Sequence, residues 1–546
     1  MTNAAPGPAV AIIGTGAMGS GIAQVAAQAG CSVHLVDALP GAAAAARDRL
    51  AATLDRLAGK GRISREDADA ATARLTVTET VADLPPCALV IEAIREDLAD
   101  KRAIFAALAK RQPADTLLAS NTSSLDVSAI ADGIAHPGRV LGLHFFNPPP
   151  LMRLVEVVHG DRTDDAVLER ATELMRAWGK TPVRCTSTPG FIVNRVARPF
   201  YGEAQRMVEA GVADPATIDY ALRELAGFRM GPLELTDLIG QDVNLAVGTS
   251  VWEQTGRDER YAPTDYQRRL VQDGHLGRKS GRGVFTYDDT GRPQGVVPDE
   301  DLARRLVAGP VVTNPVARTL AMLVNEAVDL VARGEASAED VDTAMRLGTN
   351  YPRGPLEWGA EIGLDVVAAQ LAELDGAFPG GRYRPSPALA SAGTGTTGPA
   401  ERPDGAEGPE GADLAHVRRM WVDDRASAGL GMELVHLDLD RARVRLTVGE
   451  AMVNGHEIAH GGFIFTLADS AFALACNSRG RLTVAAGADI TFVAAARLGD
   501  VLVAEATQRT AYGRSGLTDV TVTRESDGAV IAEFRGRSRS LVSKEK

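Results

Sequence analysis

Short apolar runs alternate with alanine-rich stretches of helical spacing along residues 9–150. The runs read VAIIG, SVHLVD, LVIEAI and TLLASN. Each run has the length of one strand, and the stretches between them are long enough for helices that cross from strand to strand. This alternation is typical of a parallel sheet covered by helices. We therefore expect residues 1–185 to form an α/β domain.

A pattern with helical spacing occurs twice further along the chain. At an ungapped offset of 123 residues, GEAQRMVEAGVADPATIDYAL from Gly202 aligns with NEAVDLVARGEASAEDVDTAM from Asn325. The match continues downstream, where it aligns Glu203 with Glu326, Asp219 with Asp342, Gly231-Pro232 with Gly354-Pro355, and Asp242 with Asp365. Self-similarity over this length indicates an internal duplication, and turn-forming residues separate its apolar segments. We predict two related all-helical domains, at residues 186–290 and 310–384.

The segment PSPALASAGTGTTGPAERPDGAEGPEGAD, from Pro385 to Asp413, contains almost no large apolar side chain. Such a composition cannot build a core and is typical of a disordered linker, which we place at residues 385–415. The remaining residues, 416–546, have the size of one domain. They contain one apolar helical run after HGG and then long strand-like stretches. This order predicts an antiparallel sheet with a single central helix, an α+β domain.

Length and composition limit the classes of function. A chain of 546 residues exceeds one compact core, and 45% hydrophobic with 24% charged residues is ordinary for globular domains. The net charge of −13 disfavours nucleic acid as a partner, and no long uncharged apolar run predicts a membrane span. We expect a cytoplasmic protein without a metal site, because its four cysteines are far apart in sequence: Cys31, Cys87, Cys185 and Cys476.

A glycine-rich turn directly follows the first strand of the α/β domain. Its sequence, GTGAMG, opens an alanine-rich helix, and Asp37 ends the next strand. Glycines at this place allow a tight turn and let a pyrophosphate approach backbone amides at the helix N-terminus. A carboxylate at Asp37 accepts ribose hydroxyls and repels a 2′-phosphate, so NAD is favoured over NADP. The predicted cofactor-binding residues of this turn and strand are Gly14, Gly16, Ala17, Met18, Gly19 and Asp37.

Four polar residues stand inside or beside apolar runs where core residues are expected. They are Ser123, His144, Glu156 and Asn194. Buried polar groups need partners, and a histidine oriented by a carboxylate is the arrangement that removes a hydroxyl proton as hydride leaves the same carbon. The spacing alone does not decide for this chemistry. A histidine whose hydrogen bonds are satisfied in the core is the competing interpretation.

Six motifs together resemble the 3-hydroxyacyl-CoA dehydrogenase family across residues 8–384: GTGAMG, VIEAIRED, ASNTSSL, LGLHFFNPPPLMRLVEVV, TPGFIVNRV and LGRKSGRGVFTY. The resemblance implies that the first domain is a Rossmann NAD-binding domain and the helical domains its C-terminal domains, duplicated as in longer bacterial members. It implies His144 as base, Glu156 as its partner, and Ser123 and Asn194 as ligands of the substrate oxygens. It also implies that Asn147 shapes the pocket and that Glu96, Lys101 and Asn121 lie near the nicotinamide half.

Lys60 and Arg62 stand where that family carries cations for the phosphates of coenzyme A. A solvated surface run explains the same two residues equally well. Both are candidates for binding the substrate.

The C-terminal domain carries a second candidate site. Asn454, His460 and Gly461 precede or begin a helix on which Asp469 is flanked by apolar residues. Amides at the helix start can hold a thioester oxygen as it becomes an oxyanion, and Asp469 can activate water. A capped core helix with a tolerated aspartate is the competing interpretation. Eight residues of helix separate Gly461 from Asp469 by about 12 Å, so one site needs two subunits and we expect a homo-oligomer, a dimer or a tetramer.

Residues 416–541 resemble the hot-dog thioesterases of phenylacetate degradation, on the motifs NGH, HGG, FTLADSAFALACNS and FRGRSRSL. The resemblance implies Asp469 as base or nucleophile, Gly461 as the oxyanion amide, and Asn454 and His460 as pocket residues. It implies aryl- or hydroxyphenylacetyl-CoA as substrate class.

The leading hypothesis is a bifunctional enzyme that oxidises 3-hydroxyacyl-CoA with NAD and hydrolyses acyl-CoA. Two alternatives stay open. One of the folds survives as a non-catalytic binding or oligomerisation module, or the hot-dog domain is a hydratase rather than a hydrolase.

Overall fold

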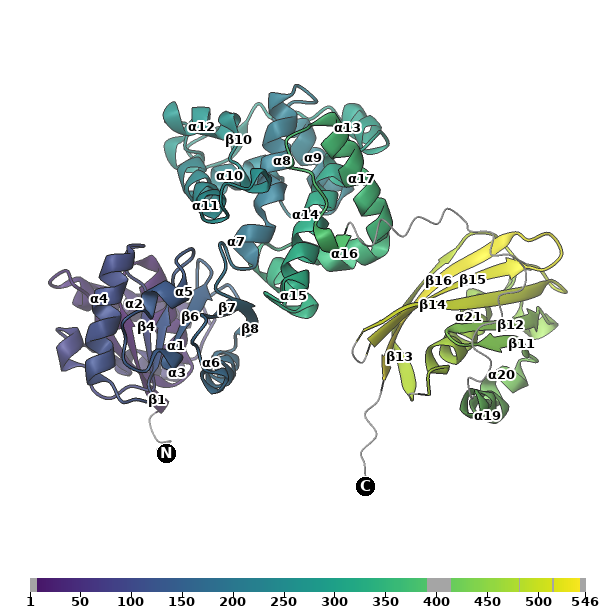
Figure 1. Cartoon of the computed structure of the whole chain (residues 1–546), viewed down its shortest axis with the longest axis horizontal. Coiled ribbons are helices and arrows are strands. Elements are labelled where there is room, and N and C mark those ends of the chain that lie inside the picture. Colours follow the sequence, from purple (N-terminus) through teal and green to yellow (C-terminus); the bar gives the residue numbers. More distant parts are fainter. Residues whose placement is uncertain (1–6, 390–413, 481, 513–514, 541–546) are drawn as a thin grey trace. The chain divides into compact units, whose positions relative to one another are not determined.

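The structure is a computed structural model that describes residues 7–389, 414–480, 482–512 and 515–540. The chain divides into two units, residues 1–398 and 399–546 (Figure 1). No helix among the described residues is long and apolar enough to cross a membrane.

The first unit begins with an α/β domain built on an eight-stranded sheet within residues 7–186. The strand order is β3-β2-β1-β4-β5-β6-β7-β8. The strands are β1 (Gly7–Ile13), β2 (Cys31–Val36), β3 (Leu75–Val77), β4 (Leu89–Glu92), β5 (Leu117–Ser120), β6 (Val140–Phe145), β7 (Leu154–His159) and β8 (Thr181–Thr186). The helices are α1 (Ala17–Gln28), α2 (Ala42–Gly59), α3 (Arg65–Ala73), α4 (Leu98–Arg111), α5 (Val127–Ile130) and α6 (Asp165–Ala177). This is the expected Rossmann architecture.

One part of the sheet departs from the parallel arrangement that the sequence pattern predicts. Strands β6 and β7 pair antiparallel, and β8 then runs parallel to β7. The connection between β6 and β7 is too short to hold the crossover helix that a parallel pair requires. The antiparallel register places His144 of β6 directly opposite Glu156 of β7.

The helical part of the first unit runs from α7 to α17 with one small hairpin. Its helices are α7 (Val193–Val196), α8 (Arg198–Glu209), α9 (Pro215–Tyr220), α10 (Pro232–Ile239), α11 (Gln241–Gln254), α12 (Asp265–Gln272), α13 (Glu300–Val307), α14 (Pro315–Ala332), α15 (Ala338–Gly348), α16 (Pro355–Ile362) and α17 (Leu364–Ala377). The hairpin pairs β9 (Thr286–Tyr287) with β10 (Pro293–Gln294). Helices α8, α9, α10 and α11 of the first copy recur as α14, α15, α16 and α17 of the second.

The two copies share a core rather than forming separate bodies. Phe200 and Leu222 of the first copy belong to the same apolar cluster as Leu323 and Met345 of the second. The described part of this unit extends through Leu389, which is buried in the same cluster. Residues 390–413 of the predicted linker lie outside the described residues, whereas its last two residues, 414 and 415, are described again. The domain boundaries therefore stay predictions.

The second unit contains a six-stranded antiparallel sheet and a central helix, as predicted. The sheet order is β11-β12-β14-β15-β16-β13. The strands are β11 (Glu433–Asp438), β12 (Arg441–Thr447), β13 (Thr483–Phe492), β14 (Val501–Tyr512), β15 (Ser515–Arg524) and β16 (Val530–Ser540). Helix α21 (Gly461–Asn477) lies against the sheet, and α19 (Ala415–Asp423) and α20 (Arg425–Gly429) precede β11 (Figure 1). The sequence pattern missed β11 and β12, since it placed the strand-like stretches only after the helix.

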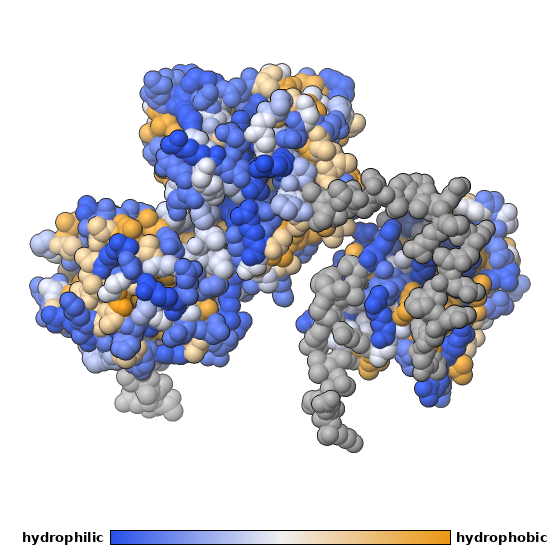
Figure 2. Space-filling model, viewed as in Figure 1, coloured by the Kyte–Doolittle hydropathy of each residue, from blue (hydrophilic) through white to orange (hydrophobic). Residues whose placement is uncertain are grey.

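Hydrophilic residues cover most of the face shown in Figure 2, and apolar patches interrupt them on both units. Among the exposed large apolar residues of the second unit, Val484 and Phe492 lie on β13. Strand β13 ends the sheet and pairs only with β16 among the described strands. Its free edge becomes relevant to the second candidate site.

Candidate active sites

The turn between β1 and α1 has three glycines with different physical reasons to be there. Gly14 has a φ of 93°, and a Cβ added to Gly19 would lie 1.8 Å from the Gly14 carbonyl oxygen. The fold itself thus demands Gly14 and Gly19. Around Gly16 a Cβ would meet no protein atom within 4 Å, so open space adjoins the N-terminus of α1. That space, with the amides of Ala17 and Met18, suits a pyrophosphate.

Asp37 lies directly after β2 and is oriented by this turn. Its Oδ2 accepts hydrogen bonds from the Thr15 N–H at 2.7 Å and the Thr15 hydroxyl at 2.8 Å, and its Oδ1 accepts from the Leu39 N–H. Burial alone raises its pKa, but these hydrogen bonds outweigh burial and hold the pKa of Asp37 below its ordinary value. A fixed, ionised carboxylate is the group that NAD ribose binding requires.

Glu96 and Lys101 organise the loop that follows β5. Glu96 Oε1 accepts hydrogen bonds from the Ser123 N–H at 2.9 Å and from the Thr122 hydroxyl. Burial raises the pKa of Glu96, but the charge of Lys101 and the hydrogen bonds together hold it below its ordinary value. The buried Lys101 ammonium lies 3.2 Å from Glu96 and 2.7 Å from Glu92. Glu96 therefore fixes the backbone of Ser123, and Lys101 in turn holds Glu96 in place.

Glu92 is the residue that sequence reasoning missed here. It ends β4, is fully buried, and accepts hydrogen bonds from Lys101, from the Ser120 hydroxyl and from the Ile94 N–H. The sequence does carry a signal for Glu92, because this carboxylate ends the apolar run LVIE. Asn121 completes this edge, since its Oδ1 accepts from the Phe145 N–H at 2.9 Å.

His144 and Glu156 form the predicted pair. Nδ1 of His144 lies 2.6 Å from Oε2 of Glu156, and both side chains are buried. An ionised carboxylate only accepts hydrogen bonds, so Nδ1 carries the proton and Nε2 is left as the basic atom. The other oxygen of Glu156, Oε1, accepts from the Ile192 and Val193 N–H groups at 3.1 and 2.9 Å. Glu156 therefore fixes both the imidazole and the start of α7.

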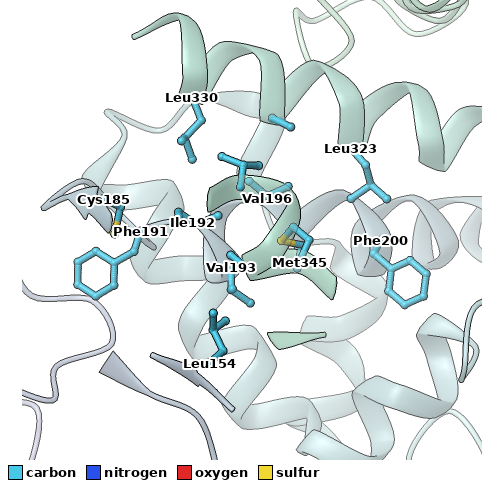
Figure 3. Close-up of a cluster of buried hydrophobic side chains, with 14 of the residues drawn as sticks. Leu154, Cys185, Phe191, Ile192, Val193, Val196, Phe200, Leu323, Leu330 and Met345 are labelled. Carbon is cyan, nitrogen blue, oxygen red and sulfur yellow. The ribbon is translucent and has the colours of Figure 1, made fainter. Parts of the chain in front are cut away.

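Helix α7 carries Asn194 and is anchored by an apolar cluster. Figure 3 shows Phe191, Ile192, Val193 and Val196 among side chains from β7, β8, α14 and α15. Asn194 itself is half-buried. The short helix is thus held by Glu156 at its start and by this core along one face, which fixes Asn194 relative to the His144–Glu156 pair.

The remaining predicted residues of the first unit are at the surface. Asn147 is exposed just after β6. Lys60 and Arg62 are exposed in the turn between α2 and α3, where neither side chain pairs with another described residue. Their roles stay predictions, as do those of Ser123 and Asn194.

In the second unit, His460 caps helix α21. Its Nδ1 accepts from the Gly462 N–H at 3.0 Å, so the Gly462 amide is not free to bind a ligand. The Gly461 N–H has no acceptor among the described residues. A Cβ at Gly461 would lie 2.8 Å from the ring of Phe492, which explains the glycine. Asn454 turns the preceding loop, because its Oδ1 accepts from the His456 N–H.

Asp469 lies two turns further along α21 and is half-buried. Burial, and then the charge of Asp424, raise its pKa above the ordinary aspartate value. Asp424 caps α20, and through Ser427 it is linked to Ser470, whose hydroxyl lies 2.8 Å from that of Ser427. No sequence signal marked Asp424.

Comparisons with known proteins agree with this geometry. The model of the 3-hydroxyacyl-CoA dehydrogenase NAD binding domain matches residues 9–188. The model of its C-terminal domain matches twice, at residues 190–287 and 315–396, and the thioesterase superfamily model matches residues 456–531. The double match confirms the duplication.

Among curated proteins, 3-hydroxyadipyl-CoA dehydrogenase of Escherichia coli K12 is 43% identical over 69% of this chain and 95% of its own length. The crystal structure of 3-hydroxybutyryl-CoA dehydrogenase from Escherichia coli K12 has a TM-score of 0.65 at 41% identity, and the match covers 71% of this chain and 98% of that one. The Escherichia coli PaaI protein from the phenylacetic acid degradation operon is 35% identical, with a TM-score of 0.23, over 24% of this chain and 96% of that one.

The chain therefore belongs to the 3-hydroxyacyl-CoA dehydrogenase family and depends on NAD. To this dehydrogenase is fused a domain of the thioesterase superfamily with a hot-dog fold.

Proposed function

We propose that the chain is a bifunctional enzyme of CoA-thioester catabolism. It oxidises a 3-hydroxyacyl-CoA to the 3-oxoacyl-CoA in its first unit and hydrolyses an acyl-CoA to acid and CoA in its second. The observation that carries the first activity is the 2.6 Å contact of His144 with the buried Glu156. The half-buried Asp469 on the helix that begins at Gly461 supports the second.

In the oxidation, the turn from Gly14 to Gly19 and the carboxylate of Asp37 would hold NAD, which would supply the acceptor for the hydride of the 3-carbon. Nε2 of His144 takes the proton of the 3-hydroxyl, and the carboxylate of Glu156 stabilises the imidazolium that results. Since Glu156 accepts two backbone hydrogen bonds from α7, it keeps its orientation while His144 changes charge. Ser123 and Asn194 bind the substrate oxygens and hold the carbon that reacts in place.

In the hydrolysis, Asp469 acts as base or nucleophile and the Gly461 amide binds the oxyanion. Both residues are on α21, separated by eight residues or about 12 Å, so they cannot serve one carbonyl within a subunit. Asp469 of one subunit works with Gly461 of the partner subunit. The enzyme is then a homo-oligomer, a dimer or a tetramer, and the free edge of β13 beside Gly461 supports association there.

The substrates we propose follow from the relatives. The first site takes 3-hydroxyadipyl-CoA or 3-hydroxybutyryl-CoA, and the second takes hydroxyphenylacetyl-CoA or a related thioester. Such reactions belong to phenylacetate and aromatic catabolism or to fatty acid β-oxidation. We place them in the cytoplasm, because all four cysteines are buried free thiols, as a reducing compartment keeps them.

The test follows NADH absorbance and free thiol in parallel with 3-hydroxyadipyl-CoA, 3-hydroxybutyryl-CoA and phenylacetyl-CoA. His144→Ala should abolish NADH formation and leave thiol release, and Asp469→Ala should do the reverse. Loss of both activities in either folded variant would overturn the two-site assignment. NADH without thiol from any substrate would favour the alternative, a dehydrogenase whose hot-dog domain serves oligomerisation or hydration.

A further inference from the structure

Arg198, the first residue of α8, is a charged side chain without a carboxylate partner. Its Nε donates to the Asn194 carbonyl oxygen at 2.8 Å and one Nη donates to the Asn244 carbonyl oxygen at 3.3 Å. Its guanidinium carbon lies 5.0 Å from the centre of the Tyr201 ring. The residue is partly exposed, burial of the guanidinium lowers its pKa, and among the described residues no Asp or Glu oxygen lies within 4 Å.

Three buried arginines of this helical part are neutralised. Arg195 pairs with Glu326, Asp329 and Glu335, while Arg318 and Arg382 both pair with Glu203. A guanidinium withdrawn from water and left with neutral partners is costly. Arg198 and Arg206 differ from these three, because both are partly exposed and bond backbone carbonyls with no carboxylate within 4 Å among the described residues. Of the two, Arg198 alone lines a hollow, and it can bind an anion from outside the chain there.

Arg198 lines a small hollow and places its guanidinium in the wall. Arg260 and Arg382 line it as well, but both are paired with carboxylates that lie outside the lining, so Arg198 is the lining arginine without such a partner among the described residues. Gln205, which is 2% exposed, also lines it. Its Oε1 accepts from the Thr264 hydroxyl, but its Nε2 has no hydrogen-bond partner in the described part of the chain. A buried donor without an acceptor is a second, independent sign that this hollow receives an acceptor group.

Arg198 connects the hollow along the chain to Asn194, the residue predicted to bind the substrate. Asn194 and Arg198 are four residues apart, and Ala197 between α7 and α8 keeps helical angles, so the two side chains share one helix face. The bond from Arg198 Nε to the Asn194 carbonyl holds the guanidinium against the backbone of Asn194. In a six-carbon acyl chain three C–C bonds, about 1.5 Å each, join the 3-carbon to the terminal carbon, within reach of one helical turn.

We propose that Arg198 binds the distal carboxylate of a dicarboxylic 3-hydroxyacyl-CoA and thereby selects such substrates over chains that end in a methyl group. This rests on the proposed dehydrogenase function and on Asn194 as a substrate ligand. A planar guanidinium binds a carboxylate through two parallel N–H groups, and Arg198 has three N–H groups that none of the described residues engages. The carboxylate supplies the negative charge that the chain itself does not.

The experiment compares 3-hydroxyadipyl-CoA with 3-hydroxyhexanoyl-CoA, which have equal chain length and differ only at the distal end. We expect the native enzyme to have a kcat/KM at least tenfold higher for the dicarboxylic substrate. Arg198→Met should lower kcat/KM for 3-hydroxyadipyl-CoA by about 10- to 100-fold, mainly through KM, which is the size of a charge-assisted hydrogen bond. The same variant should change kcat/KM for 3-hydroxyhexanoyl-CoA less than threefold.

A matched control is Arg206→Met, on the same helix. Arg206 bonds the Ala262 carbonyl and does not line the hollow, so its substitution should leave the ratio of the two substrates unchanged. Arg198→Lys, which keeps the charge without the fork, should fall between the native enzyme and Arg198→Met. Equal losses for both substrates in Arg198→Met, or no native preference, would overturn the proposal.

Calorimetric binding of adipyl-CoA and hexanoyl-CoA, which cannot be oxidised at a 3-hydroxyl, separates this proposal from the dehydrogenase function; it is measured with Asp469→Ala present throughout, so that the second unit does not hydrolyse the thioesters. Absence of NADH from every 3-hydroxy substrate would contradict the proposed function. Tighter binding of adipyl-CoA that Arg198→Met or Arg198→Lys weakens would still support the role of Arg198, and equal binding of the two thioesters by the native enzyme would contradict it.

Discussion

Two aspartates in the second unit have pKa values shifted in opposite directions. Burial and the charge of Asp424 raise the pKa of Asp469. Burial also raises that of Asp424, but the hydrogen bonds it accepts from Ser427 and Ala426 outweigh burial and lower it. Asp424 therefore stays charged in the pH range in which Asp469 titrates. Two nearby carboxyl groups whose pKa values are shifted in opposite directions are typical of sites where one of them acts as acid or base.

Replacing Asp424 by Asn should shift the pH profile of thiol release. If Asp469 is the base, activity rises as pH rises through its pKa. Removal of the Asp424 charge lowers that pKa, so the midpoint of the acid limb moves to lower pH. An asparagine keeps the helix cap. Asp423→Asn, at the exposed neighbour, serves as control, and an unmoved midpoint in Asp424→Asn would refute the coupling.

Residue-level prediction succeeded where a polar group interrupted an apolar run. His144 and Glu156 were found in this way, and their contact is confirmed. The same rule would have found Glu92 had it been applied to LVIE. Asp424 and Arg198 could not be identified from the sequence, because their roles depend on neighbours that are distant in sequence. These are Asp469 for Asp424 and Asn244 for Arg198.

At the scale of single elements, the turn before α1 contains two kinds of glycine. The fold requires Gly14 and Gly19, whereas the ligand requires Gly16. Gly16→Ala should leave the unfolding free energy within about 1 kcal/mol of the native value, since its φ is −63° and no protein atom lies near its Cβ. The same change should weaken NAD binding at least tenfold, as followed by fluorescence titration. Gly19→Ala, whose Cβ would clash with the Gly14 carbonyl, should instead destabilise the apo protein. Equal effects of both variants on stability would contradict this division.

Helix α8 carries a buried carboxylate that holds the duplicated helices together. Glu203 accepts hydrogen bonds from Arg318 of α14, from Arg382 and from Tyr383. Burial alone raises its pKa, but the two arginines lower it to about 2. The unfolded chain then binds a proton more readily between pH 4.5 and 2. The stability that Glu203 contributes is full above that range and is lost as pH falls through it.

Glu203→Gln should therefore lower the unfolding free energy at pH 7 by about 3–5 kcal/mol, the usual cost of breaking a buried ion pair. The difference from the native protein should shrink as pH falls from 5 to 2, measured by chemical denaturation. Glu300→Gln breaks a solvent-exposed pair with Arg304 and should cost less than about 1 kcal/mol. A deficit that does not change with pH would show that the charge of Glu203 is not what stabilises the fold.

Element types were predictable, but their directions and pairings were less so. The four strand-like runs of the first domain and the helix after HGG became β1, β2, β4, β5 and α21. The reversed direction of β7 and β8 escaped the pattern, because strand periodicity is the same in both directions. Strands β11 and β12 escaped it too, because their alternating charged residues weaken the apolar signal.

At the scale of the whole molecule, the duplication forms an interface within one chain. Arg195 of the first copy pairs with Glu326 of the second, and Arg318 of the second pairs with Glu203 of the first. The offset of 123 residues relates both arginines and both glutamates. Such reciprocity is the property of a two-fold interface, in which each partner contributes the same surface. The sequence revealed the repeat, whereas its reciprocal contacts required the structure.

A two-fold interface between subunits is the remaining requirement of the second site. The free edge of β13 ends the sheet beside Gly461, and the side chain of Val484 on that strand is 42% exposed. Val484→Lys combined with Thr491→Lys places like charges on this edge, which would face each other in a self-complementary interface. Thiol release should fall at least tenfold, because Asp469 loses the Gly461 amide of the partner subunit. NADH formation should stay within twofold, because His144 and Glu156 belong to the first unit.

The other edge of the same sheet provides the control for that experiment. Val435 on β11 is 51% exposed, and Val435→Lys should alter neither thiol release nor the mass measured by sedimentation. The β13 variant should sediment at a lower mass than the native chain. If the β13 variant no longer associated and still released thiol at the native rate, Asp469 and Gly461 would not act across subunits. The oxyanion would then have to be bound by a donor within one copy, on the same side of α21 as Asp469. Since eight residues of helix fix the separation of Gly461 from Asp469, no rearrangement of α21 could reconcile that outcome with the site proposed here.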